Sequence, residues 1–345
     1  MRRPSRQGGT RLRFGLSAVV LLLAASCGVS PRLRQMAPPP ADARPSASGT
    51  AELSVLTYNV EGLGWPARSG RAGQLKQIGR RLKAMRDAGH APDVVLFQEV
   101  FSGAAKRAIL ATGYPAIVSG PHRTMKAQPS VTMPLPGITR WKHGELGIHL
   151  TGGGIVIASR YPIVGDARQP YGRRSCAGID CLANKGVMLA RIAVPGVPVP
   201  IDIYNTHMNS RGASKAPEPR NLAAHERQAF EASQFFKQTH ADDNPMIFGG
   251  DFNMRHSEPR WDNLSRYQTL HLVHRVCADP QSGCDVRMSW DGDEPWMDTQ
   301  DLQFFANGKR ATVRPIRVEA MFDGGSSGPE LSDHDGFLVT YRIDW

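Results

Sequence analysis

The sequence predicts an α/β protein in which two β-sheets pack together and helices cover their outer faces. Three observations lead to this fold class. Short apolar runs rich in Val, Ile, Tyr and Phe recur from residue 53 to residue 343, with the length and composition of strands. Segments with apolar residues at helical spacing interrupt these runs. No second linker or internal repeat divides the chain after residue 51, which leaves one domain of about 295 residues.

The predicted elements alternate in a strand-rich order. The first strand, 53–60, reads LSVLTYNV and alternates in polarity. The first helix, 74–88, places Leu75, Ile78 and Leu82 on one face, with Arg and Lys between them. In chain order we predict strand 53–60, helix 74–88, strand 93–100, helix 103–112, strands 155–160, 187–194 and 200–207, helix 221–240, and strands 245–253, 301–307, 311–319 and 337–343.

The residues before this domain predict export. Residues 1–13 hold five arginines and no acid, and FGLSAVVLLLAAS (14–26) is apolar, ends in small residues and is too short for a permanent membrane span. These features predict a signal peptide over 1–26. The run LAASC resembles a bacterial lipobox, so Cys27 is expected to carry lipid and to anchor the protein to the outer membrane or cell surface; plain secretion is the alternative. The Pro/Ala/Ser-rich stretch 27–50 predicts a disordered tether, followed by the catalytic domain 51–345.

The net charge says little about the partner. Removing the five arginines of the signal peptide lowers the formal charge from +11 to about +6. A charge of this size fits a weak preference for anionic surfaces and equally an ordinary soluble protein. It does not by itself identify nucleic acid as the partner.

The cysteines agree with export. Apart from Cys27, they form two closely spaced pairs, Cys176 with Cys181 and Cys277 with Cys284. In an oxidising compartment this pattern predicts two local disulfides. A zinc site would need all four side chains together and usually tighter spacing, which disfavours that interpretation.

Polar residues stand where the predicted strands end. Each follows or precedes an apolar run that would be buried, so its side chain would lie at the rim of a sheet. Solvated turns more often use Lys or Ser, which are absent at these positions. The residues in question are Asn59, Glu99, His207, Asp251, Asn253, Asp333 and His334.

The motifs around these residues resemble, in order, those of the endonuclease/exonuclease/phosphatase superfamily, the group that includes deoxyribonuclease I. The resemblance covers residues 53–345. It implies a four-layer α/β sandwich of two mostly antiparallel β-sheets flanked by helices, and hydrolysis of a phosphoric ester. The motifs are TYNVEG (57–62), LFQEV (96–100), YNTHMNS (204–210), GGDFN (249–253), TQDLQFF (299–305) and LSDH (331–334).

The resemblance implies a metal site. Glu99 would be the principal ligand of Mg²⁺, with Asn59 nearby and Asp333 completing the metal side. Glu61 matches an acidic position that some relatives use as an auxiliary ligand. Hard carboxylate oxygens suit Mg²⁺, with Mn²⁺ or another divalent ion as the alternative, and the metal would act as a Lewis acid on the phosphate.

The resemblance also assigns the remaining residues. Asp251 would orient the attacking water, Asn253 would bind a phosphate oxygen, and His207 would stabilise phosphoryl charge or assist the leaving group. His334 would be the general base or a phosphate-stabilising imidazole, held by Asp301, because a carboxylate on Nδ1 fixes the tautomer and raises basicity. Which histidine is base and which is acid stays open.

Two substrates remain in competition. The segments GIVIASRYPI (154–163) and CLANKGVMLARI (181–192) look like those of neutral sphingomyelinases, in which Lys185 could contact the phosphate. The loop MSWDGDEPWM (288–297) has a composition that suits insertion at a membrane interface. Together with export, these features favour a membrane phospholipid as the substrate of a monomeric phosphodiesterase.

A secreted deoxyribonuclease-like endonuclease is the rival. The segment 114–150 matches nothing in the family, and its Arg123, Lys126, Arg140 and Lys142 could cradle a nucleic-acid backbone. The family's usual Asp-Tyr also appears here as Asp-Leu. A surface lipoprotein that only binds is a third class, which the intact polar set argues against.

Overall fold

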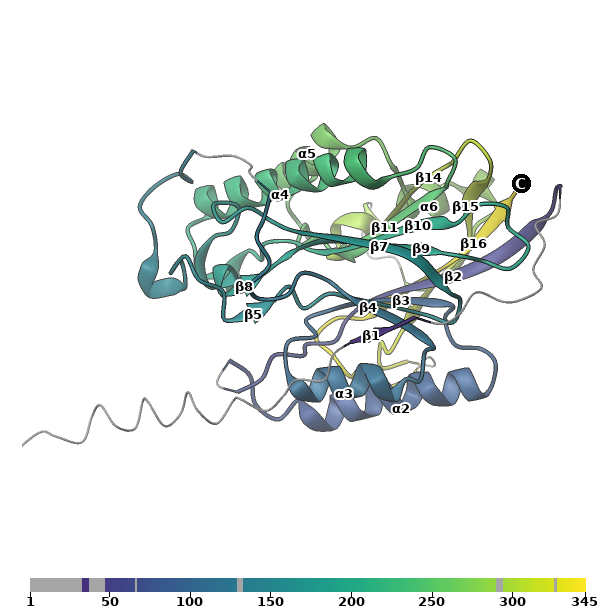
Figure 1. Cartoon of the computed structure of the whole chain (residues 1–345), viewed down its shortest axis with the longest axis horizontal. Helices are drawn as coiled ribbons and strands as arrows, with labels where there is room; N and C mark the ends of the chain where they lie inside the picture. The colour runs from purple at the N-terminus through teal and green to yellow at the C-terminus, as the bar shows by residue number, and fades with distance from the viewer. Residues whose placement is uncertain (1–32, 37–46, 66, 129–132, 290–293, 326–327) are drawn as a thin grey trace, which may run out of the picture. The chain divides into compact units, whose positions relative to one another are not determined.

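Two β-sheets pack face to face between Leu33 and Trp345 (Figure 1). The side chains between them are mostly aliphatic, and Val55, Leu96 and Ile203 are among those fully buried there. This interior explains why the strands are rich in β-branched residues. The computed structural model describes residues 33–36, 47–65, 67–128, 133–289, 294–325 and 328–345. The expected signal peptide and Cys27 lie outside the described residues.

Among the described residues, the larger sheet has eight strands in the order β1-β4-β6-β3-β2-β16-β15-β13. β2 pairs with β3, and β13 with β15, in parallel, whereas the other neighbours are antiparallel. The strands are β1 (Arg34–Gln35), β2 (Thr50–Asn59), β3 (Val94–Gln98), β4 (Ala116–Ser119), β6 (Val156–Ser159), β13 (Asp285–Arg287), β15 (Thr312–Met321) and β16 (Gly336–Asp344).

The smaller sheet has the order β12-β14-β11-β10-β9-β7 in the part of the chain that the structure describes. Only β10 and β11 are parallel neighbours in it. The strands are β7 (Ile163–Pro170), β9 (Gly186–Ile192), β10 (Ile201–His207), β11 (Met246–Asp251), β12 (His271–Leu272) and β14 (Asp301–Ala306). A separate pair joins β5 (Thr151–Gly152) to β8 (Ala183–Asn184).

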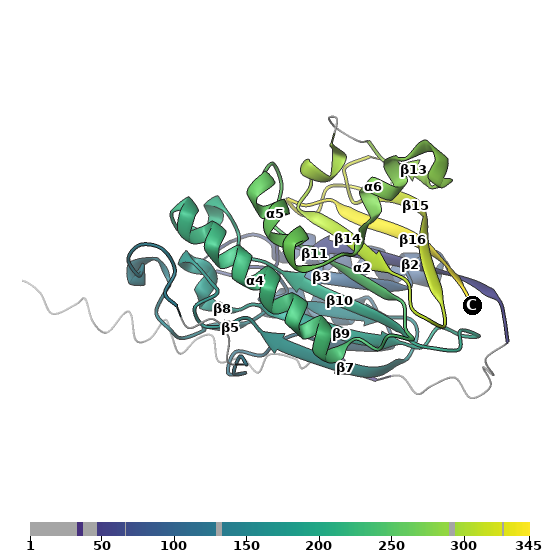
Figure 2. The same cartoon turned by 90° about the horizontal axis from the view of Figure 1, so that it is seen from above.

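Helices complete four layers. α2 (Ala72–Asp87) and α3 (Gly103–Ala111) cover the outer face of the larger sheet, where the apolar face of α2 is buried. α4 (Glu218–Thr239) and α5 (Glu258–Tyr267) cover the outer face of the smaller sheet (Figures 1 and 2). A short α6 (Val273–Ala278) packs on β14 and β15. The fold class expected from the sequence is confirmed.

Several elements were not predicted. β4, β7, α5 and α6 are short or carry mixed polarity, so their sequences lack a clear period. The expected tether also differs in one place, because Arg34 and Gln35 pair with β4 beside the buried Leu33. Residues 37–46 of that stretch lie outside the described residues.

The two predicted disulfides are confirmed. Cys176 is bonded to Cys181, and Cys277 to Cys284. Disulfides of this kind persist in oxidising compartments. No helix within the described ranges has both the length and the apolarity needed to cross a bilayer.

Candidate active site

Strand register brings three of the predicted site residues into one row of the smaller sheet. β10 and β11 run parallel and pair His207 with Asp251. β11 and β14 run antiparallel and pair Asp251 with Asp301. Polar residues that end or begin three separate apolar runs therefore stand side by side at one end of the strands.

The larger sheet supplies the facing residues. β2 and β3 pair Asn59 with Gln98, which places Glu99 directly after the end of β3. The Nδ2 atom of Asn59 donates a hydrogen bond to Asp251 Oδ2 at 3.0 Å and so joins the two sheets. Ser332 Oγ donates to the carbonyl oxygen of Asn59 at 2.7 Å, which fixes the loop before β16 at the same point.

His334 is held between two carboxylates. Its Nδ1 lies 2.5 Å from Asp301 Oδ2, and its Nε2 lies 3.9 Å from Asp251 Oδ2. Burial alone would lower the pKa of His334, but the charges of Asp301 and Asp251 outweigh it and hold that pKa well above its ordinary value. This favours the protonated imidazole, which donates from Nδ1 to Asp301. The pairing of His334 with Asp301 is the one that the sequence predicted.

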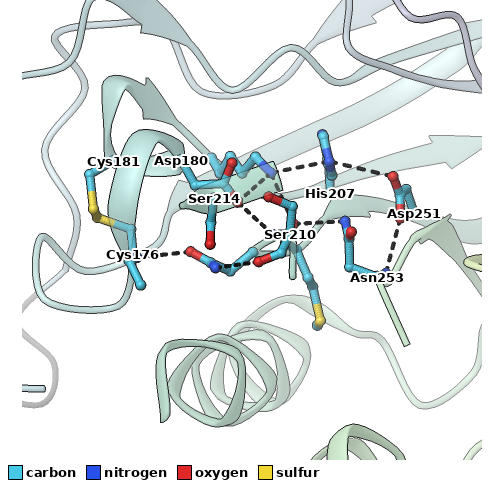
Figure 3. Close-up of polar contacts among 12 residues, drawn as sticks. Cys176, Asp180, Cys181, His207, Ser210, Ser214, Asp251 and Asn253 are labelled. Carbon is cyan, nitrogen blue, oxygen red and sulfur yellow. Dashed lines mark hydrogen bonds and ion pairs between the residues drawn. A yellow bond between two sulfur atoms is a disulfide. The ribbon is translucent and has the colours of Figure 1, made fainter. Parts of the chain in front are cut away.

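His207 has the opposite environment; Figure 3 shows it beside Asp251. Its Nε2 lies 3.5 Å from Asp251 Oδ2 and 3.1 Å from the Nζ of Lys185. Burial, followed by the charges of Lys185 and His334, lowers the pKa of His207 well below its ordinary value. His207 is therefore neutral, and because Lys185 only donates, Nε2 is the accepting nitrogen.

Lys185 is buried and fully engaged. Besides His207, its Nζ contacts Asp180 Oδ2 at 3.1 Å and donates to the carbonyl oxygen of Met208 at 2.9 Å. Asp180 also accepts from the backbone nitrogen of Ser210 (Figure 3). Asp180 was not predicted from the sequence. Its position in the loop closed by the first disulfide is the only signal that could have suggested it.

Asp251 lies at the centre of the arrangement. Its Oδ1 accepts from the backbone nitrogen of Asn253 at 3.0 Å, while Oδ2 accepts from Asn59. Asn253 has a φ of 55° and donates from Nδ2 to the carbonyl oxygen of Met208 at 3.2 Å. Burial raises the pKa of Asp251, with Asp301 adding to the effect. A carboxylate with a raised pKa is a better proton acceptor than an exposed one.

Glu99 sits in a strained and desolvated position. Its φ is 59°, and a Cβ placed on Gly62 would lie only 2.3 Å from its carbonyl oxygen, so glycine is required there. Burial raises the pKa of Glu99 to about 7, with Asp251 adding to the effect and Lys185, His334 and Asn59 opposing it. Strain of this kind persists only where the surroundings enforce it, often at functional sites.

The donor set fits a magnesium ion. Within the described residues, ligand atoms of Asp251, Asp301 and His334 lie within 4.8 Å of one another. However, Asp301 and His334 already bind each other, so we read this trio as a unit that handles protons. The desolvated carboxylate of Glu99 offers the hard oxygen ligands that Mg²⁺ prefers. Asn59 lies beside this site, but its amide oxygen already accepts from the backbone nitrogen of Glu61 at 3.0 Å.

Two of the expected metal ligands have contacts or exposure that the sequence did not predict. The carboxylate of Glu61 forms ion pairs with Arg68 and Arg71, and Arg71 also donates to the carbonyl oxygen of Leu331 at 2.6 Å. Glu61 thus has two arginine partners, and its auxiliary metal role stays a prediction. Asp333 is exposed and lies outside the close trio, although its charge still raises the pKa of His334.

A buried arginine supports the site from α5. Arg260 Nη1 donates to the carbonyl oxygens of Asn253 and Asn209 at 3.0 and 2.6 Å, and Nη2 donates to Asn221 Oδ1 at 2.8 Å. This guanidinium holds the loop after β11 in its left-handed turn. Arg260 was not predicted from the sequence, because a single arginine in an amphipathic helix is usually exposed.

Curated relatives are similar in sequence to this chain. Sphingomyelinases of Mycobacterium tuberculosis (strain ATCC 25618 / H37Rv) and Mycobacterium bovis are each 25% identical to this chain over 306 residues. The match covers 86% of this chain and 54% of each relative. The chain therefore spans about half the length of the curated relatives that it matches.

Solved structures share the fold. Sphingomyelinase C from Streptomyces griseocarneus gives a TM-score of 0.58 at 21% identity, over 84% of this chain and 99% of that chain. Beta toxin from Staphylococcus aureus gives 0.58 at 19%, over 83% and 99%. Humanized D. rerio TDP2 gives 0.55 at 16%, over 84% and 98%. Residues 56–334 also match the Endonuclease/Exonuclease/phosphatase family. The chain belongs to this family, whose members are metal-dependent phosphoric ester hydrolases.

Proposed function

We propose that the protein is an exported, Mg²⁺-dependent phosphodiesterase that hydrolyses a membrane phospholipid in the manner of a sphingomyelinase. One observation carries the catalytic part of this proposal. Two histidines approach the same oxygen of Asp251, His207 at 3.5 Å and His334 at 3.9 Å, and their environments shift their pKa values in opposite directions. Paired groups whose pKa values are driven apart are typical of acid–base catalysis.

Asp251 and His334 have different roles in the proposed reaction. Asp251 accepts the proton of the attacking water, since its pKa is raised and its geometry is fixed by Asn59 and Asn253. His334, cationic and oriented by Asp301, stabilises negative charge on the phosphoryl group or protonates the leaving oxygen.

Residues on the other side of Asp251 bind the phosphodiester. His207 stays neutral and keeps Lys185 beside the site, where the ammonium attracts the anionic phosphodiester. Asn253 presents its amide to a phosphate oxygen. In this proposal His334 is the cationic group, and Asp251, which the sequence predicted to orient the attacking water, also accepts its proton. His207 does not take the charge-stabilising role that the sequence predicted for it.

Glu99 would be the principal ligand of the metal, with Asn59 nearby. When bound there, Mg²⁺ supplies a Lewis acid that neutralises charge on a non-bridging phosphate oxygen. A beta toxin variant from Staphylococcus aureus, which has the same fold (TM-score 0.54, 18% identity, 85% of this chain and 99% of that chain), contains bound magnesium ions. That structure supports the choice of metal.

Support for a phospholipid comes from the curated sphingomyelinases. Support for export comes from the apolar leader and from two disulfides. Attachment through lipid on Cys27 remains part of the proposal, as does the division into leader, tether and catalytic domain.

The test is a side-by-side assay with Mg²⁺ and with EDTA. The substrates are sphingomyelin vesicles, plasmid DNA and a simple phosphomonoester, and each is tested with the wild type, Glu99→Gln and His334→Ala. We expect metal-dependent release of phosphocholine that both variants lose. Turnover of sphingomyelin that persists in EDTA, or in both variants, would contradict the proposed mechanism.

A nuclease is the second candidate. The exposed cations of the 121–150 region favour it, and D. rerio TDP2 in complex with a single-strand DNA product has the same fold (TM-score 0.55, 15% identity, 84% of this chain and 99% of that chain). Metal-dependent nicking of plasmid DNA without lipid turnover would establish this alternative and leave the catalytic assignments standing.

A further inference from the structure

An unusual apolar surface lies outside the catalytic centre. Six large apolar side chains between residues 133 and 150 are exposed, from 50% for Leu146 to 81% for Ile138. Soluble proteins rarely gather exposed apolar residues in this way unless something covers them. We call these residues the apolar surface; they are Met133, Ile138, Trp141, Leu146, Ile148 and Leu150.

The segment that carries the apolar surface is held firmly. Glu145 accepts from Arg220 of α4 at 2.8 Å and from the backbone nitrogen of Gly178 at 3.0 Å. Arg220 also donates to the carbonyl oxygen of Leu135, whose side chain is buried. The exposed side chains are therefore presented outward by a fixed backbone.

Positive charge surrounds the apolar surface. Arg123, Lys126, Arg173 and Arg174 are exposed and line a hollow of about 720 Å³ that also includes Ile148. The acids of the neighbouring segments are occupied internally, since Glu145 binds Arg220 and Asp180 binds Lys185. The rim is left with an excess of cations.

This surface is connected to the active site. Gly178 begins the short 3₁₀ turn Gly178–Leu182, which contains Asp180. Asp180 in turn holds Lys185 against His207. The apolar surface thus belongs to the same end of the fold as the catalytic row. Figure 1 shows the segment just before β5, next to β8.

We propose that the apolar surface and its cationic rim dock the protein onto a bilayer that contains anionic phospholipid. Aliphatic side chains and a tryptophan enter the interfacial region of a membrane, while flanking basic residues attract acidic headgroups. The hollow beside Ile148 is large enough to receive such a headgroup. A nucleic acid would match the cations but would leave the aliphatic side chains without a partner.

The site differs from the loop that the sequence suggested for insertion. In that loop Trp296 is partly buried and its ring lies 4.8 Å from the guanidinium of Arg275, while Trp290 is outside the described residues. The inference deepens the proposed function, because it names the surface that brings a membrane substrate to the site. Its test does not need turnover.

The experiment places a fluorescent reporter on the apolar surface. The full chain carrying Cys27→Ser receives Ile148→Cys, which is labelled with an environment-sensitive dye while the disulfides stay oxidised. The matched control carries the dye at Val164→Cys, a position of similar exposure (49% against 58%) on β7. Vesicles are phosphatidylcholine with and without phosphatidylglycerol.

On vesicles that contain phosphatidylglycerol, we expect the dye at residue 148 to shift to the blue and to gain intensity several-fold, while the dye at residue 164 keeps its aqueous spectrum. Replacing Arg173 and Arg174 by glutamine should weaken vesicle binding on the order of tenfold. The same change at Arg80 and Arg81 on α2 should leave binding unchanged.

Four results would overturn the inference. The first is that the protein sediments with the vesicles while the dye at residue 148 keeps its aqueous spectrum, and the second is that the protein does not sediment with them at all. The third is that the dye responds equally on vesicles without phosphatidylglycerol, and the fourth is that it responds to DNA alone. Failure of the proposed function looks different: the dye would still enter the membrane, but sphingomyelin would not be hydrolysed.

Discussion

Asp301→Asn tests the pairing of His334 and Asp301 most directly. The substitution keeps the size of the side chain and removes the charge that faces His334 Nδ1 at 2.5 Å. Both side chains are nearly buried, with 11% and 5% exposed, so solvent screens the interaction weakly. The fold should survive, because Asp301 still pairs with Asp251 through the backbone ladder.

The magnitude follows from the lost hydrogen bond. A hydrogen bond to a charged group contributes about 1.5–3 kcal/mol. Since about 1.4 kcal/mol corresponds to a factor of ten in rate, kcat should fall about 10- to 150-fold. Loss of the carboxylate also lowers the pKa of His334, so the alkaline limb of the pH–rate profile should move to lower pH.

The assay is steady-state hydrolysis of sphingomyelin at several pH values, with Asp335→Asn as the matched control. Asp335 is an exposed carboxylate in the same loop, and its variant should keep wild-type kinetics. In a His334→Ala background, Asp301→Asn should add little, because the two residues act as a unit. A folded Asp301→Asn protein with unchanged kcat and an unchanged pH profile would refute this account of His334.

Three further predictions concern the metal, the backbone and the core. Glu99→Gln should weaken Mg²⁺ binding, measured by titration calorimetry, by at least about tenfold. The Mg²⁺ affinity of the wild type should also fall as the pH drops below about 7, the metal-free pKa of Glu99, because protons compete with the metal for the carboxylate. Gly62→Ala should lower kcat sharply while the protein remains folded by circular dichroism, since the new Cβ would lie 2.3 Å from the carbonyl oxygen of Glu99. Burial lowers the pKa of His225 and His274 to about 3, whereas the pKa of a histidine in the unfolded chain is near 6.5. Between about pH 3 and pH 6.5 the unfolded state therefore binds more protons than the folded state. The free energy of unfolding in urea should therefore decrease as the pH falls below about 6.5, by about 1.4 kcal/mol per pH unit for each histidine, and a flat profile would contradict this.

The strands of the core could be predicted from the sequence because apolar residues, which are usually buried, recur along them. β3, β10 and β11 are buried throughout, carry apolar residues along most of their length and end at polar residues, so both their positions and their functional ends could be predicted. β4 and β7 could not be predicted, since one is four residues long and the other is an edge strand of mixed polarity.

The candidate site was predictable only in part. Residues within motifs, such as His334 with Asp301, were named correctly as partners. Asp180 and Arg260 act through contacts with residues distant in sequence, and no local pattern marks such a partner. The arginine partners of Glu61 were missed for the same reason, since ion pairs depend on which loops meet.

The site also requires the two sheets to be in register with each other, and an apolar core does not set that register. Buried amides do. Gln98 donates to Asn205 Oδ1 at 2.8 Å across the interface between the sheets, and Asn205 donates to the carbonyl oxygen of Phe97 at 3.0 Å. On the other side of β2, Gln303 donates to the carbonyl oxygen of Val55 at 2.9 Å. Each of these bonds would be lost if one sheet slid by a residue, and a buried amide without a partner costs about 1–3 kcal/mol. The amides therefore fix the alignment that places Glu99 opposite Asp251, and the catalytic geometry depends on polar residues in the interior as much as on those at the strand ends.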